Sequence, residues 1–168
     1  MNASKVGDVA WYLPSTPLPP RLLLVTYFGP TFAMTTEYAS PDELVKLLKD
    51  PSLKAGRDFL VIDVRSDDYH GGHIPGAVNI PSHQFLHNVA AQVSQFKDTP
   101  VLYFHCALSQ VRGPKCAARY AAELVSLGKS ETQSIKILRG GFGGWQEMYR
   151  DDPELVEDYI KKVWEAGW

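Results

Sequence analysis

From Thr35 onward, short runs of apolar residues alternate with segments in which apolar residues recur every three or four positions. Four- to five-residue apolar runs bounded by polar or turn residues are typical of buried strands, whereas the longer periodic segments indicate amphipathic helices. The predicted strands cover residues 59–62, 77–80, 101–104 and 134–138, and three predicted helices cover 82–96, 113–127 and 151–164. A further helix is predicted to start after Ser40, its expected N-cap, with Pro41 in the first turn, Glu43 three residues after the cap and an apolar stripe of Leu44, Leu47 and Leu48. Strands that alternate with helices favour an α/β fold with a mainly parallel central sheet of four or five strands and helices on both faces.

Residues 1–33 differ from the remainder of the chain in their proline content. Five of the 12 prolines fall in this segment, and the segment shows no hydrophobic periodicity. We therefore expect residues 1–33 to form a poorly ordered or strapping N-terminal extension. The remaining residues, 34–168, are predicted to form one domain.

The composition narrows the class of protein. A content of 45% hydrophobic and 21% charged residues is that of a globular chain, and a net charge of −2 argues against a nucleic-acid-binding protein. The apolar runs stay below the ~18 residues that a membrane-spanning helix needs, so no membrane association is expected. With only two cysteines, Cys106 and Cys116, no disulfide framework can form, which favours the cytoplasm, the nucleus or both.

The segment from Val101 to Pro114 carries the clearest chemical signal. A predicted buried strand is followed by His105 and Cys106, then by five residues, and then by Arg112 at the start of a predicted helix. The carboxyl ends of parallel strands are where α/β sheets bind ligands, and a helix N-terminus attracts anions. The same surroundings favour the thiolate form of a cysteine. We therefore predict that Cys106 is a catalytic nucleophile that faces a bound oxyanion.

The other residues of this loop are predicted to bind the oxyanion. Backbone amides of a tight loop can converge on one point, and an arginine adds a planar, two-pronged donor. The predicted oxyanion-binding residues are Ala107, Leu108, Ser109, Gln110, Val111 and Arg112. The Ser109 hydroxyl is interpreted either as a donor to the thiolate or substrate, or as a small side chain that lets the amides converge.

Four motifs in the same order resemble those of rhodanese-fold phosphatases of the M-phase-inducer type and of the eukaryotic arsenate reductases. The resemblance covers roughly residues 38–150. It rests on His105-Cys106-x5-Arg112-Gly113-Pro114, Val61-Ile-Asp-Val-Arg65, Tyr69-His-Gly-Gly-His-Ile-Pro-Gly-Ala-Val78 and the glycine-rich turn before a helix in Leu138-Arg-Gly-Gly-Phe-Gly-Gly-Trp145. It implies a rhodanese-like domain and a phosphatase that forms a phosphocysteine, with arsenate reduction as an alternative or second activity.

Differences within the resemblance bear on the activity. Sulfur-transferring rhodaneses typically have four residues between the cysteine and the basic residue, and this chain has five, so sulfur transfer is the less favoured reading. Cell-cycle phosphatases of this type carry acidic residues in the loop where this chain has Ala107 and Val111, and a second cysteine where it has Val64. At these positions the chain looks more like the arsenate reductases and the minimal phosphatases of the family. For an arsenate reductase, glutathione, with a glutaredoxin, would serve as reductant. No resident cofactor and no metal are implied.

Several further residues are weighed between a functional and a structural role. His105 is expected to hold the backbone of the loop, and Asp63 and Arg65 to form an ion pair or orient the loop, with a proton-donor role as the alternative. Cys116 is interpreted as a small buried residue in preference to a resolving thiol. The pairs His70/His73 and His83/His87 lack the further ligands of a metal site, and Trp145 and Tyr149 read as core residues.

The expected partner is a phosphorylated protein or a small phosphate or arsenate oxyanion, and the sequence assigns no oligomeric state. A non-catalytic phosphopeptide- or anion-binding module is the rival from another class. The presence of both Cys106 and Arg112 disfavours that rival, because an anion-binding module needs no nucleophile.

Overall fold

The computed structural model describes residues 36–165 of the chain. The predicted extension, residues 1–33, lies outside the described residues. Within residues 36–165, no helix is long and apolar enough to cross a membrane.

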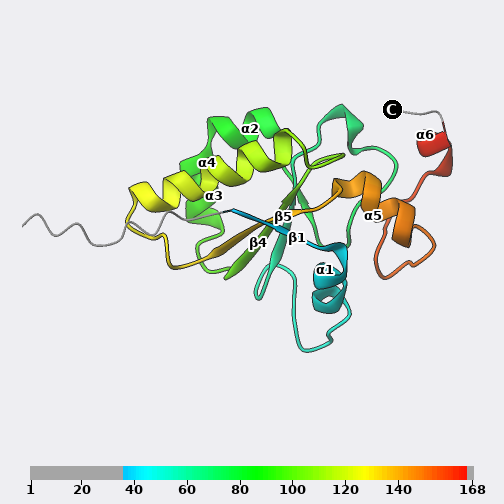
Figure 1. The fold of residues 1–168 in the computed structure, drawn as a ribbon, viewed down its shortest axis with the longest axis horizontal. Helices are drawn as coiled ribbons and strands as arrows, with labels where there is room; N and C mark the ends of the chain where they lie inside the picture. Colours follow the sequence, from blue (N-terminus) through cyan, green and yellow to red (C-terminus); the bar gives the residue numbers. More distant parts are fainter. Residues whose placement is uncertain (1–35, 166–168) are drawn as a thin grey trace, which may run out of the picture. The chain divides into compact units, whose positions relative to one another are not determined.

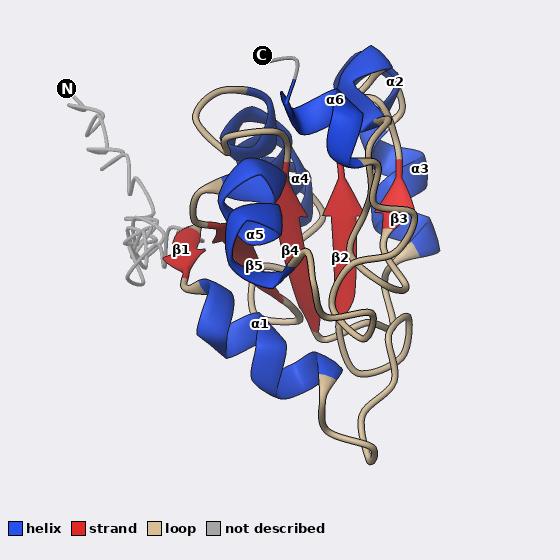
Figure 2. Cartoon of the chain, turned by 90° about the vertical axis from the view of Figure 1, so that its right-hand side faces the viewer, coloured by secondary structure: helices blue, strands red, loops and turns tan. Residues whose placement is uncertain are grey.

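A five-stranded parallel sheet forms the centre of the domain, in the order β1-β5-β4-β2-β3. The arrowheads of β2, β3 and β4 point the same way in Figure 2, so that their carboxyl ends meet at one edge. The strands are β1 (Glu37–Ala39), β2 (Leu60–Asp63), β3 (Val78–Asn79), β4 (Val101–His105) and β5 (Ser134–Leu138). The predicted α/β class and parallel sheet are confirmed.

Helices cover both faces of this sheet (Figure 1). The helices α2 (Ser82–His87), α3 (Val89–Gln95) and α4 (Arg112–Ser126) lie on one face, and α1 (Pro41–Leu48) and α5 (Gly141–Tyr149) lie on the other. A 3₁₀ helix, η1 (Asp67–Tyr69), follows β2, and a short α6 (Lys161–Glu165) ends the described chain.

The alternation of side chains along the central strands explains the two layers of core. In β4, Leu102 and Phe104 point to the core under α4, whereas Tyr103 points to the core under α1 and α5. Successive side chains of a strand face opposite sides, so a continuous apolar run fills both layers. Cys106, which follows β4, continues the first of these rows and is packed in the core under α4.

The capping pattern at Ser40 is present as predicted. Its hydroxyl accepts a hydrogen bond from the backbone N–H of Glu43, 3.3 Å away, and Pro41 occupies the first turn of α1. This arrangement satisfies one of the free N–H groups at the helix start.

The helix predicted over residues 151–164 is wrong for most of its length. The chain forms turns up to Ile160, and only Lys161–Glu165 are helical. The backbone of Glu157 exchanges two hydrogen bonds with that of His73, at 2.9 and 3.0 Å, and Asp158 has a φ of 53°. This long-range pairing holds the segment extended, which hydrophobic periodicity cannot reveal.

Three other boundaries differ from the sequence predictions. The single helix predicted over 82–96 is broken at Asn88, whose φ of −121° is not helical. The strand β1 was not predicted, because three residues are too few to show a pattern. The helix α5 was expected only through the resemblance, because its glycines hide its periodicity.

Candidate active site

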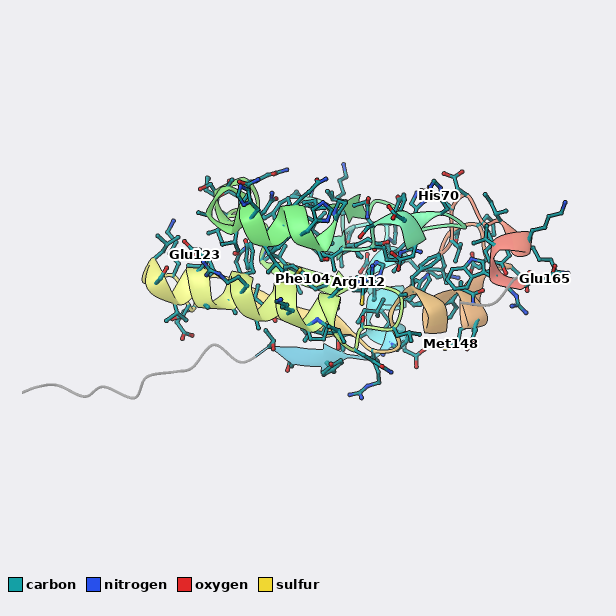
Figure 3. The ribbon with its side chains drawn as sticks, turned by 90° about the horizontal axis from the view of Figure 1, so that it is seen from above. His70, Phe104, Arg112, Glu123, Met148 and Glu165 are labelled. Carbon is teal, nitrogen blue, oxygen red and sulfur yellow. The ribbon has the colours of Figure 1, made fainter. Side chains whose placement is uncertain are left out.

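Cys106 and Arg112 stand at the two ends of one loop. Cys106 is the first residue after β4, and Arg112 is the first residue of α4. Figure 3 shows Arg112 at the start of α4, with Glu123 towards its other end. The loop borders a shallow cleft of about 210 Å³, which is lined by Cys106, Ala107, Leu108, Gln110, Val111 and Arg112. The structure therefore brings five of the six predicted oxyanion-binding residues, and the predicted nucleophile, to one opening.

The first turn of α5 holds the backbone of this loop in place. The N–H groups of Phe142 and Gly143 donate to the carbonyl oxygens of Cys106 and Ala107, at 2.9 and 2.8 Å. The C=O and N–H of a trans peptide point in opposite directions. The N–H groups of Ala107 and Leu108 therefore point away from α5, which leaves them free to bind an anion.

A glycine is required at the contact between this turn and the loop. Gly141 has a φ of 60°, and a Cβ at this position would lie 2.5 Å from the carbonyl oxygen of Ala107. Side chains larger than hydrogen would push the two segments apart. The glycine-rich motif that followed the last predicted strand is thus a backbone support for the loop of Cys106.

Ser109 has a left-handed backbone conformation within the loop. Its φ is 51°, and its carbonyl oxygen accepts a hydrogen bond from the Tyr38 hydroxyl, 3.2 Å away. The Ser109 side chain is 2% exposed, and its hydroxyl has no hydrogen-bond partner among residues 36–165. An unpaired buried hydroxyl is costly, so this group is available to a bound oxyanion or water molecule.

Two of the most exposed side chains around the cleft, those of Leu108 and Val111, are apolar. Leu108 is 57% exposed and Val111 is 70% exposed. Neither these two side chains nor that of Ala107 can donate a proton. The loop therefore supplies a nucleophile and backbone donors, but no acid of its own.

Arg112 is engaged by a carboxylate that the sequence analysis did not assign to the site. Its Nη1 donates to Oδ1 of Asp68 at 2.7 Å, and its Nη2 donates to Oδ2. Burial raises the pKa of Asp68, but the hydrogen bonds from Arg112 and from the Ser66 N–H outweigh it, and the net pKa is lowered. The ion pair also raises the pKa of Arg112. Asp68 lies 44 positions away in the sequence, so no local pattern pointed to this pairing.

A buried ion pair lies at the carboxyl end of β2, beside β4. The carboxylate of Asp63 accepts from Nε and Nη2 of Arg65, and both side chains are fully buried. Arg65 also stacks on the ring of Phe142, 4.1 Å away, and donates to the backbone oxygens of Gly72 and Asp68. Asp63 and Arg65 thus orient the segment that carries Asp68, as the structural alternative for this pair anticipated.

His105 lies beneath the loop and is fully buried. Its Nδ1 is 3.3 Å from the carbonyl oxygen of Cys106, and its Nε2 is 3.7 Å from Oδ2 of Asp63. Burial lowers the pKa of His105, and the nearby charge of Asp63 opposes this effect without cancelling it. A neutral imidazole therefore packs against the backbone that presents Cys106.

Cys116 lies in the second turn of α4 and is fully buried. Burial is the main cause that raises its pKa to about 12, and the charge of Cys106 adds to the effect. A thiol that stays protonated at neutral pH is a weak nucleophile. This environment agrees with a packing role for Cys116.

The remaining candidates lie outside the cleft. Residues 36–165 contain no group of three or more metal-binding side chains, and His73 instead pairs with Glu157 at 3.1 Å. Trp145 is buried, donates to the carbonyl oxygen of Leu155 at 2.8 Å and packs against Tyr149 with ring centres 4.7 Å apart.

Known proteins resemble this chain over most of its described length. The family model of the rhodanese-like domain matches residues 40–148. Dual specificity phosphatase ibp1 of Schizosaccharomyces pombe is 37% identical over 139 residues, which cover 73% of this chain and 97% of that protein. Arsenate reductase 2.2 of Oryza sativa subsp. japonica is 34% identical, over 68% of this chain and 85% of that protein.

A solved structure of a yeast protein tyrosine phosphatase of the rhodanese family has a TM-score of 0.62 to this chain. It is 28% identical, and the match covers 77% of this chain and 96% of the other. The family model alone spans more than half of the sequence. The chain therefore belongs to the rhodanese-like domain family, among relatives that are named as phosphatases and arsenate reductases.

Proposed function

We propose that the chain is a cysteine-dependent phosphatase of the tyrosine or dual-specificity type. The observation that carries this proposal is the loop itself, in which Cys106 and Arg112 border one cleft and the loop carbonyls are turned away towards α5. That arrangement leaves backbone N–H groups for the oxygens of a tetrahedral anion. The similarity to dual specificity phosphatase ibp1 supports the same reaction class.

In the proposed reaction, the Cys106 thiolate attacks phosphorus in line with the departing oxygen. The sulfur–phosphorus bond forms as the bond to the leaving group breaks, and the leaving oxygen takes a proton from solvent water. Arg112 and the amides of residues 107–112 stabilise the charge on the equatorial oxygens. Water then attacks the phosphocysteine, releasing phosphate and restoring the thiolate.

Arsenate reduction is the second candidate, and the absence of an acid from the loop favours it. Ala107 and Val111 cannot protonate an alkoxide leaving group, whereas arsenate can carry its own proton to the departing water. Cys106 would form an arsenyl-cysteine with loss of water. Two thiols of glutathione, with a glutaredoxin, would then be oxidised to one disulfide as arsenate becomes arsenite. The similarity to a rice arsenate reductase supports this candidate.

Parallel assays of the purified protein distinguish the two activities. One assay uses aryl phosphates of rising leaving-group pKa, and the other uses arsenate with glutathione and glutaredoxin. We expect good aryl phosphates to be hydrolysed, phosphoserine to be poor, and arsenate to be accepted, because general acid catalysis typically contributes ~10²–10⁴ in rate. Fast turnover of phosphoserine would contradict the missing acid. Absence of turnover in both assays would favour the anion-binding module.

A further inference from the structure

Asp68 places a carboxylate directly on the arginine of the proposed oxyanion site. Its two oxygens accept from the two terminal nitrogens of Arg112, with 2.7 Å between Nη1 and Oδ1. The side chain of Asp68 is 16% exposed and that of Arg112 is 33% exposed, so water screens the pair only in part. The guanidinium has five N–H donors, and two point to Asp68, which leaves three for another acceptor.

The position of this carboxylate is fixed by its own surroundings. The Ser66 N–H donates to Oδ1 of Asp68 at 3.0 Å, and Nη1 of Arg65 donates to the Asp68 carbonyl oxygen at 3.3 Å. Arg65 is in turn held by the buried carboxylate of Asp63. Asp68 is thus anchored at its backbone and at its side chain, and its carboxylate does not depend on Arg112 alone for its position.

A carboxylate at this place changes which anions the site accepts. It offsets much of the positive charge of Arg112, so each additional negative charge on a bound ion is less well compensated. It is also an acceptor, and it can receive a hydrogen bond from an oxyanion that still carries a proton. Phosphate and arsenate carry at least one such proton near neutral pH, whereas sulfate carries none.

We propose that Asp68 is a specificity-determining residue of the oxyanion site, which selects protonated tetrahedral oxyanions such as phosphate and arsenate over fully ionised ones such as sulfate. The proposal rests on the proposed function, because it assumes that the loop of Cys106 binds the anion. It also assigns a role to the ion pair of Asp63 and Arg65, which holds the selecting carboxylate in place.

The test measures how well each anion protects Cys106 from alkylation by iodoacetamide in the full chain. Mass spectrometry of the Cys106 peptide gives the concentration of phosphate or sulfate that halves the rate. For the wild type we expect protection by phosphate at lower concentration than by sulfate. In Asp68→Asn, which keeps the shape of the side chain, we expect the preference for phosphate to fall by on the order of tenfold, mainly through better binding of sulfate.

Matched variants separate selectivity from folding. Asp67→Asn removes a charge from the neighbouring exposed residue of η1 and should keep the wild-type preference. Asp68→Glu keeps the charge and should also retain a preference for phosphate, even if the Asn variant folds poorly. If Asp68→Asn changed protection by phosphate and by sulfate equally, the preference would be unchanged. That result would overturn the role of Asp68 and leave the proposed oxyanion site standing. Absence of protection of the wild type by either anion would overturn the oxyanion site and this role with it.

Discussion

At the scale of single residues, Cys106 combines a buried position with access to the cleft. It is 4% exposed and lies between the core under α4 and the backbone donors of the loop. Cys106→Ser should lower turnover by roughly three orders of magnitude or more, because a hydroxyl is a far poorer nucleophile at neutral pH. Binding of phosphate should persist, because Arg112 and the amides remain. Steady-state kinetics and phosphate titration check both parts, and substantial residual turnover would remove Cys106 from its role.

The buried imidazole of His105 predicts a dependence of stability on pH. The pKa of His105 is lowered in the folded protein, so below about pH 6.5 the unfolded chain binds a proton that the folded chain does not. The free energy of unfolding should therefore decrease as pH falls from about 7 to 5.5, by at most about 1.4 kcal/mol per pH unit from this group. Urea denaturation at several pH values measures the slope.

The control for this prediction is an exposed histidine. His105→Gln should flatten the pH dependence of the unfolding free energy, whereas His87→Gln, at an exposed position of α2, should leave its slope close to that of the wild type. Equal slopes in wild type and His105→Gln would show that His105 is protonated equally in the folded and unfolded states.

At the scale of elements, the contact between the start of α5 and the loop after β4 decides the shape of the site. Gly141→Ala would place a methyl group 2.5 Å from the Ala107 carbonyl oxygen at a φ of 60°. We expect a loss of about 2 kcal/mol or more in unfolding free energy, together with weaker anion binding. Gly144→Ala is the matched control in the same helix, because a Cβ there meets no atom within 4 Å. Similar behaviour of the two variants would contradict the role of this contact.

The helix α4 carries the second cysteine into the core rather than into the cleft. Cys116→Ala should leave turnover nearly unchanged in reducing buffer and should cost about 1 kcal/mol of stability, because it removes one buried sulfur atom. Kinetics with both phosphate and arsenate substrates, next to a thermal melt, check this prediction. A selective fall in arsenate turnover would instead make Cys116 part of the redox cycle.

At the scale of the whole molecule, the domain proposed for residues 34–168 should fold and act without residues 1–33. The rhodanese-like family model matches residues 40–148, which lie entirely within it. We expect a chain that begins at Met34 to have the melting temperature and aryl phosphatase rate of the full chain. A marked drop in either quantity would indicate that residues 1–33 strap the domain and contribute to its stability or site.

The sequence by itself determined the α/β class, the succession of the central strands and helices along the chain, and the loop that runs from Cys106 to Arg112. These features are local. The apolar run of four residues, 101–104, predicts β4, and the residues that follow it place a cysteine at a strand end and an arginine at a helix start. For the same reason the capping pattern at Ser40 could be predicted, since its atoms lie within three residues of each other.

Only the tertiary structure decided which distant groups support that loop. Asp68 meets Arg112 across 44 positions, Tyr38 meets the Ser109 carbonyl across 71, and His73 holds Glu157 in an extended backbone where periodicity predicted a helix. Each of these contacts depends on how the fold brings distant segments of the chain together, and a one-dimensional pattern holds no information about that proximity. The nucleophile could therefore be predicted from the sequence, whereas the carboxylate that faces its arginine could not.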